Sequence, residues 1–240
     1  MKRRQATVHA MSSVDNEQKT IMDTQSKPKI SATISLSPST HSYTSSQPPS
    51  LNLILTSHHP TPITIYADDL SPSLMLACGA FTITSLTTGS IIKQSRRTHC
   101  RIPPPTKVAV PLLEHLFHTL LPHTPTTLSA PFSRSRKKTS GKPLAKDDPE
   151  YGNDPSARHG ACGVDGLETG DDYALQLAGD SRVPWNTVRW WEHGTKEEVL
   201  HPKDAEEELD GRKVRFGAGP HEEIVVDSTA FKGLSFKCVE

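Results

Sequence analysis

"GLETGDDYALQLA", residues 166–178, is the stretch whose pattern decides the fold. Within it, Tyr173, Leu175 and Leu177 alternate with the smaller or polar Ala174 and Gln176. Neighbouring side chains of a β-strand point to opposite faces of the sheet, so this spacing puts the three large side chains on one face. The glycines and acidic residues before the tyrosine are typical of a turn. The stretch therefore predicts a strand that follows a turn and buries one face.

The same two-residue period recurs elsewhere in the chain. In "KISATISLS" (29–37), Ile30, Ala32, Ile34 and Leu36 alternate with serine and threonine. The other segments with this period are "SLNLILTSHH" (50–59), "TPITIYA" (61–67), "GAFTITSLTTGSII" (79–92), "HEEIVVDS" (221–228) and "GLSFKCVE" (233–240). Turns rich in proline, serine and histidine separate them, which indicates an antiparallel all-β domain. Over residues 74–92 the same period favours a sheet segment over a membrane span.

Leu167, Gly170 and Tyr173 have the Leu-x-x-Gly-x-x-Tyr spacing of a tyrosine corner. This segment resembles fibronectin type III and related immunoglobulin-like sandwiches. The resemblance implies that the Tyr173 hydroxyl bonds to backbone upstream of it and closes one end of a sandwich. The sequence departs from those folds in two ways: it lacks their disulfide-and-tryptophan core, and its tryptophans follow the corner. The resemblance supports a sandwich and carries no function.

The whole chain also resembles a family of uncharacterised small proteins predicted in filamentous-fungal genomes. The resemblance lies in the doubled tryptophan (Trp190 and Trp191) and in "GTKEEVL" (194–200), which follow a Gly-Leu-Glu-x-Gly corner at 166–170. That family has no assigned activity, so the resemblance implies a fold and no mechanism.

These patterns predict an all-β protein: an antiparallel immunoglobulin- or fibronectin III-like β-sandwich with one short helical segment, a disordered N-terminus and a long disordered insertion. The helical pattern runs from Leu112 to Leu121. The predicted organisation is a disordered tail over residues 1–26 and a single sandwich domain over 27–240. A mobile insertion at about 133–163, first basic and then acidic, interrupts that domain.

Composition limits the classes of partner. The chain has 27 basic and 27 acidic side chains, a formal net charge of zero, which argues against a nucleic-acid or membrane-surface protein. Only 34% of residues are hydrophobic and 20 are proline, as expected of a chain with substantial disordered segments. The basic N-terminal start lacks the apolar stretch of a leader, and the four cysteines lack Cys-x-x-Cys spacing. We therefore expect a cytoplasmic protein, with a nuclear location as the alternative.

Histidine is the residue type that offers chemistry, with 12 copies. His115 and His118 in "EHLFH" lie three residues apart beside Glu114, and one helical turn would place both on one face. A zincin requires His-Glu-x-x-His, which this is not. We favour two surface histidines flanking buried Leu112 and Phe117, and keep metal binding as the alternative. No nucleophile elbow or phosphate loop is present, so we predict no catalytic residue and no cofactor.

The remaining candidate is "VPWNTVRWWEHGTKEEVL", residues 183–200. Read as one strand, it sends Val188 and Trp190 inward and leaves Arg189 and Trp191 on the outer face. An exposed tryptophan beside arginine has the composition of an interface hot spot. We therefore select Arg189, Trp191 and Lys196 as partner-binding candidates. For Trp191 itself we favour cover by the chain, through the 133–163 insertion or the charged connection after residue 196, and keep partner binding as the alternative.

Two classes of function follow. The first is a non-enzymatic intracellular module that presents an exposed sandwich face, or loops at one end of the sandwich, to an unknown protein partner. The second is a metal-binding protein or enzyme that uses clustered histidines such as His115 and His118.

Overall fold

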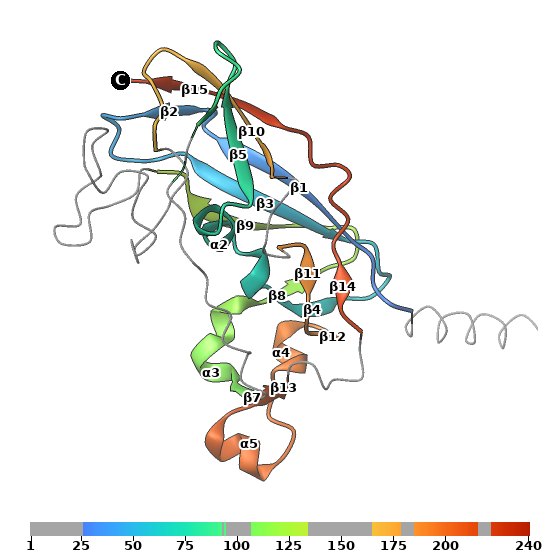
Figure 1. Cartoon of the computed structure of the whole chain (residues 1–240). Helices are drawn as coiled ribbons and strands as arrows, with labels where there is room; N and C mark the ends of the chain where they lie inside the picture. The colour runs from blue at the N-terminus through green and yellow to red at the C-terminus, as the bar shows by residue number, and fades with distance from the viewer. Residues whose placement is uncertain (1–25, 93, 95–106, 134–164, 179–184, 216–221) are drawn as a thin grey trace, which may run out of the picture.

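The computed structural model describes residues 26–92, 94, 107–133, 165–178, 185–215 and 222–240 (Figure 1). Its first sheet has three antiparallel strands. In order across the sheet they are β1 (Ile30–Ser37), β3 (Ser50–Ser57) and β9 (Pro125–Pro131). The register aligns Ile34 with Leu53 and Leu53 with Leu128, and all three side chains are buried. The alternation in each sequence segment thus becomes one continuous apolar face.

The second sheet has five strands and contains the stretch quoted first. In order they are β2 (Thr40–Ser42), β15 (Leu234–Val239), β10 (Asp172–Leu177), β5 (Phe81–Ser85) and β6 (Ile91–Ile92). Its pairings are antiparallel except that of β15 with β2, which is parallel. In the centre, β10 aligns Leu175 with Ile83 on one side and with Leu234 on the other.

The apolar faces of these two sheets share one core, which confirms the predicted all-β sandwich. Phe132, just after β9, meets Phe236 of β15 edge to face, with ring centroids 5.2 Å apart. Tyr173 of β10 stacks on Phe236, with ring centroids 5.5 Å apart. The short helix α2 (Pro72–Ala77) begins with proline, whose missing N–H costs nothing at that position, and buries Met75 and Leu76 in the same core.

The Tyr173 hydroxyl makes the upstream backbone contact that the corner pattern implies. Its Oη accepts a hydrogen bond from the Glu168 N–H at 2.6 Å and donates to the Glu168 carbonyl at 3.4 Å. Tyr43 adds a second clamp, because its Oη donates to the Leu167 carbonyl at 2.7 Å. Burial, followed by the charge of Asp171, raises the pKa of Tyr173 to about 12, so the hydroxyl keeps its proton.

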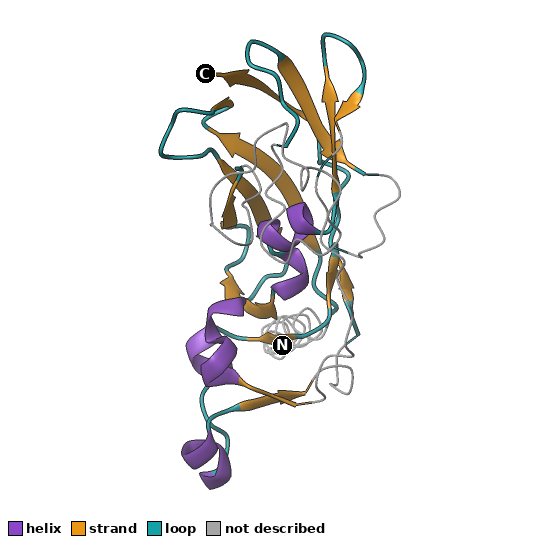
Figure 2. Ribbon diagram, turned by 60° about the vertical axis from the view of Figure 1, so that its left-hand side comes forward, coloured by secondary structure: helices purple, strands orange, loops and turns teal. Residues whose placement is uncertain are grey.

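Smaller elements extend the molecule away from the C-terminal strand (Figure 1). A three-stranded sheet has the order β12 (Trp191–His193), β4 (Ile63–Tyr66) and β8 (Phe117–Leu120). Two-stranded ribbons pair β7 (Lys107–Ala109) with β13 (Lys213–Arg215), and β11 (Thr187–Val188) with β14 (Ile224–Val225). The helical turns are η1 (Asp68–Leu70), α3 (Val110–Leu113), η2 (Glu114–Leu116), α4 (Lys196–Val199) and α5 (Ala205–Asp210). Figure 2 places α3, α4 and α5 together at one end.

This end has a core of its own, which we call the second core. It consists of Val110, Phe117, Trp190, Val199 and Val214. Trp190 meets Phe117 edge to face at 5.1 Å, a geometry that aromatic pairs favour. Trp191 belongs instead to the sandwich core. The two adjacent tryptophans therefore pack in different cores, and residues 190–191 connect the second core to the sandwich core.

Three local predictions were wrong. The pattern from Leu112 to Leu121 predicted one helix, whereas the chain turns through α3 and η2 and then enters strand β8 at Phe117. Residues 74–77, expected in a sheet segment, lie in α2, and helical turns are more numerous than the single one expected. Residues 1–25 of the predicted tail and 134–163 of the predicted insertion lie outside the described residues.

Candidate functional site

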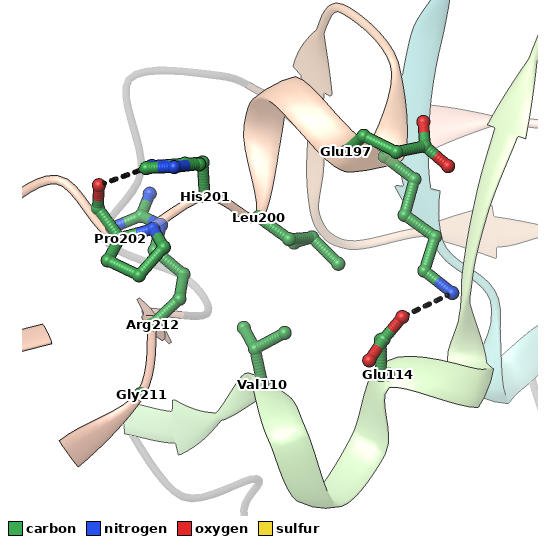
Figure 3. A pocket seen from close by; sticks show the side chains of 9 residues that line it. Val110, Glu114, Glu197, Leu200, His201, Pro202, Gly211 and Arg212 are labelled. Carbon is green, nitrogen blue, oxygen red and sulfur yellow. Dashed lines mark hydrogen bonds and ion pairs between the residues drawn. The ribbon is translucent and has the colours of Figure 1, made fainter. Parts of the chain in front are cut away.

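An open hollow of about 340 Å³ lies among α3, η2, α4 and the residues after α5 (Figure 3). We call it the α3–α4 hollow. Its apolar lining is made by Val110, Leu200, Pro202 and Gly211, and its polar lining by Glu114, Lys196, Glu197, His201 and Arg212. Val110 and Leu200 face its middle, while Glu114 and Glu197 lie on one side and His201 and Arg212 on the other.

The start of α4 fixes the wall that carries Lys196. Thr195 caps the helix: its Oγ1 accepts from the Glu198 N–H at 3.4 Å, and Glu198 Oε2 accepts from the Thr195 N–H at 2.8 Å. Gly194 precedes the cap with φ of 114°, and a Cβ there would lie 3.2 Å from both Glu198 and Val199. The Lys196 N–H donates to Thr119 Oγ1 of β8 at 2.7 Å, which anchors the helix to the sheet.

Lys196 lies within a small group of titratable side chains. Its Nζ is 3.2 Å from Glu114 Oε1, and the side chain of Lys196 is largely buried while that of Glu114 is largely exposed. Burial, and then the charges of Lys196 and His115, lower the pKa of His118. His118 is therefore neutral near pH 7, and the Glu114 carboxylate is the counter-ion of Lys196.

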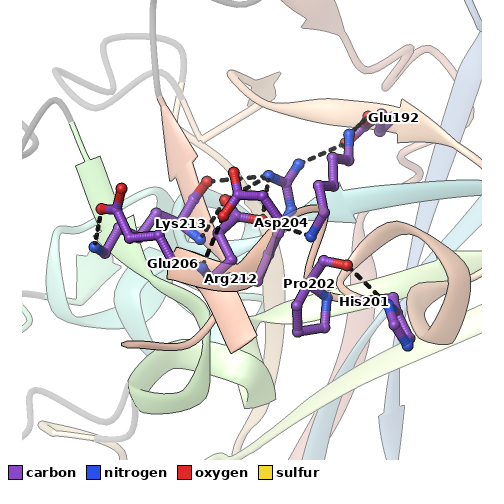
Figure 4. Close-up of polar contacts among 9 residues, drawn as sticks. Glu192, His201, Pro202, Asp204, Glu206, Arg212 and Lys213 are labelled. Carbon is purple, nitrogen blue, oxygen red and sulfur yellow. Dashed lines mark hydrogen bonds and ion pairs between the residues drawn. The ribbon is translucent and has the colours of Figure 1, made fainter. Parts of the chain in front are cut away.

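The opposite side of the hollow is supported by a network of charges around Arg212 (Figure 4). Arg212 Nη1 donates to Glu207 Oε1 at 2.9 Å and to Oε2 at 3.2 Å, and Nη2 lies 3.8 Å from Glu192. Lys203 also binds Glu192, at 2.9 Å. Burial of Glu207 opposes its charge, yet hydrogen bonds from the Lys203 N–H, Arg212 and the Lys213 N–H outweigh it and lower the pKa of the Glu207 carboxyl.

Of the three predicted partner-binding residues, Lys196 alone lines this hollow. Trp191 is 4% exposed, so the prediction that it lies on an outer face was wrong. Its Nε1 donates to the Glu222 carbonyl at 2.9 Å, and the chain itself covers the ring. The guanidinium of Arg189 binds Asp69 at 3.0 Å in a largely buried ion pair. Arg189 and Trp191 are thus engaged inside the protein.

The structure separates the environments of the two candidate metal-ligating histidines. His115 is exposed in η2, and His118 is half-buried in β8, so they do not share a helical face. Leu112, expected to be buried between them, is 79% exposed. Within the described residues, no group of three or more histidine, cysteine, aspartate or glutamate side chains is arranged to hold a metal ion.

A different polar cluster, which the sequence analysis missed, lies beside β1. Ser31 Oγ is 2.8 Å from His58 Nε2, and the His58 and His123 rings are 6.0 Å apart. The Asp227 carboxylate accepts from the Thr229 N–H, and that bond, ahead of the charge of His58, lowers the pKa of Asp227. Serine, histidine and aspartate are the residue types of nucleophilic catalysis. No single sequence segment contains them, which is why the spacing of residues gave no signal.

None of the helices in the described part of the chain is long and apolar enough to cross a membrane. A comparison with protein-family models found no match, and no curated protein sequence matches the chain.

Proposed function

We propose that this chain is a non-enzymatic protein-interaction module whose partner docks in the α3–α4 hollow. The observation that carries the proposal is the hollow itself: Val110, Leu200 and Pro202 form an apolar floor, and charged side chains surround it. An apolar centre within a polar rim is the arrangement of protein–protein contact sites. The proposed docking site therefore lies at the end of the molecule that holds Lys196, and not on the sandwich face around Trp191. We assign the interaction to the cytoplasm or nucleus, in keeping with the composition.

Ordered charges support the same proposal. Lys196 and Arg212 are held by Glu114 and by Glu207, so their positions are set before a partner arrives. A contact surface that is already ordered loses less conformational entropy on binding than a flexible one.

Site-specific photo-crosslinking tests the proposal. A photoreactive side chain is placed at Glu197, on the hollow, and separately at Ile91, which is 72% exposed on β6 of the sandwich. In an extract of cells that make the protein, we expect a partner to be captured from position 197 and not from position 91. Leu200→Ser should reduce that capture while thermal unfolding shows the chain still folded. Equal capture from both positions would exclude the hollow as the docking site.

The second candidate function is an enzyme that uses histidines, and the Ser31–His58 hydrogen bond favours it. A fluorophosphonate probe tests it: Ser31 Oγ would bond to phosphorus as fluoride leaves, and His58 would take the hydroxyl proton. An enzyme of this kind requires labelling at Ser31 that His58→Gln abolishes. Absence of labelling in the wild-type chain excludes it.

A further inference from the structure

We propose that the partner segment bound by the α3–α4 hollow is cationic: a peptide stretch in which an apolar side chain lies between lysine or arginine residues. This inference rests on the proposed function and names the class of partner. It follows from three features of the hollow: which of its charges are already paired, what charge surrounds it, and what its floor can accept.

The cations of the hollow are already compensated. Lys196 binds Glu114 at 3.2 Å, and Arg212 makes two bonds to Glu207 and lies near Glu192. An incoming carboxylate would meet repulsion from the carboxylate that each cation already binds. Its attraction to these cations is therefore largely offset.

The uncompensated charge is negative. Glu197 lies on the hollow, is exposed, and has no ion-pair or hydrogen-bond partner among the described residues. Residues 192–215, which supply most of the lining, contain eight acidic and five basic side chains, a net charge of −3. The whole chain has a net charge of zero, so this segment stands out as locally acidic. Complementary charge steers association and selects among partners.

The floor requires an apolar group as well. Leu200 and Pro202 are only partly buried and face the hollow beside Val110. A volume of about 340 Å³ lies at the small end of ligand sites, which span about 300–1,000 Å³, and suits one or two side chains. A small ion would leave this floor exposed, whereas a leucine-sized side chain would cover it and bring its neighbours to Glu197.

Capped pentapeptides added to the isotope-labelled full chain test the inference by amide NMR shifts. The probes are glycine-capped tripeptide cores: lysine-leucine-lysine, glutamate-leucine-glutamate and lysine-serine-lysine. We expect the first to shift the amides of Glu197, Leu200 and Gly211 and to bind more tightly than the other two. Glu197→Lys should weaken it at least about fivefold, because an attractive charge pair of about 1 kcal/mol is lost and a repulsive one takes its place. Asp172→Lys, the same charge change on strand β10 of the sandwich, should not.

The outcomes separate this inference from the proposed function. Tighter binding of the glutamate peptide at the same amides would overturn the cationic partner and leave the hollow as a docking site. Equal weakening by Glu197→Lys and Asp172→Lys would mean that only the net charge of the chain matters, and it would also overturn the inference of a cationic partner at the hollow. If no peptide shifts these amides while crosslinking at Glu197 captures a partner, the peptide class is wrong and the docking site stands. If crosslinking fails as well, both proposals fall.

Discussion

Tyr173 combines a fully buried ring with a hydroxyl that serves the backbone rather than a ligand. Its Oη satisfies the Glu168 N–H, and Tyr43 binds the neighbouring Leu167 carbonyl. Tyr173 of β10 and Tyr43, which directly follows β2, thus hold the same turn. Its residues would otherwise carry backbone polar groups without partners. The first of these bonds was expected from the resemblance of Leu167, Gly170 and Tyr173 to a tyrosine corner; nothing near Tyr43 in the sequence predicted the second.

Tyr173→Phe keeps the ring and removes the bond, leaving the Glu168 N–H without its acceptor. We expect the free energy of unfolding to fall by about 1–3 kcal/mol, the cost of an unsatisfied partly buried donor. Urea unfolding measures it. Tyr43→Phe is the matched control, with an expected loss of about 1 kcal/mol, because the Leu167 carbonyl retains a second lone pair. An unchanged unfolding midpoint for Tyr173→Phe would show that the hydroxyl does not stabilise the folded chain.

Trp190 and Trp191 show where residue-scale reasoning from a two-residue period fails. The prediction treated residues 183–200 as one strand, whereas β11 ends at Val188 and β12 begins at Trp191. Alternation does not continue through a break in the strand, so the two rings do not divide into an inner and an outer one. Each ring enters a different core.

Trp191→Phe should therefore destabilise the chain. The smaller ring leaves space in the sandwich core and takes the Nε1 donor from the Glu222 carbonyl. We expect a loss of about 1–3 kcal/mol in chemical denaturation. Stability unchanged together with loss of the partner crosslinked from Glu197 would instead return Trp191 to the role of a contact residue.

At the scale of elements, strands were predicted better than helices. Each strand of the two main sheets except the short β2 lies in a segment with visible alternation. This includes β9, where "TTLSAPF" (126–132) predicts an edge strand ending at Pro131 and the strand ends at that residue. The stretch from Leu112 to Leu121 failed because pairing decides its second half: Phe117 aligns with Tyr66 and Leu120 with Ile63 in the ladder between β8 and β4. Those backbone bonds come from a strand more than 50 residues earlier in the chain, and they override a local helical preference.

Helix α4 is four residues long and depends on its cap rather than on its own length. Thr195→Ala removes the acceptor of the Glu198 N–H and should cost about 1 kcal/mol of unfolding free energy. Because α4 carries Lys196 and Glu197, the same change should weaken partner capture at the hollow. Thr195→Ser retains the hydroxyl and serves as the control. Equal losses for both variants would attribute the effect to the threonine methyl group.

At the scale of the whole molecule, the candidate site could not be predicted because it is assembled from distant parts of the chain. Val110 and Glu114 come from one region, Lys196 to Pro202 from another, and Arg212 follows α5. A single sequence contains no signal that these segments meet. The fold class could be predicted because alternation repeats in most strands of the two main sheets and needs no knowledge of which strands pair.

The stability of the whole molecule should fall in two stages as the pH is lowered. Burial, and then Lys196 and His115, lower the pKa of His118 below its usual 6.5, so the unfolded chain binds this proton more readily than the folded chain does. The folding stability linked to the neutral form of His118 is present above pH 6.5 and is lost as the pH falls below that value. His118→Gln should flatten this first stage in unfolding experiments between pH 7 and pH 5, about the range in which histidine titrates.

The second stage belongs to carboxyls whose pKa values are lowered in the folded chain. For Glu198 the principal cause is the hydrogen bond from the Thr195 N–H, and for Asp227 it is the bond from the Thr229 N–H. The stability that these two carboxylates contribute is present above their ordinary pKa values, 4.5 for Glu198 and 3.8 for Asp227. It is lost below those values, because protonation breaks these bonds.

Glu198→Gln keeps the shape of the capping box without its charge. The stability gap between Glu198→Gln and wild type should therefore be largest near pH 6 and close below about pH 4, the range of glutamate titration. A gap that is constant across this range would mean that the charge of Glu198 contributes nothing to folding.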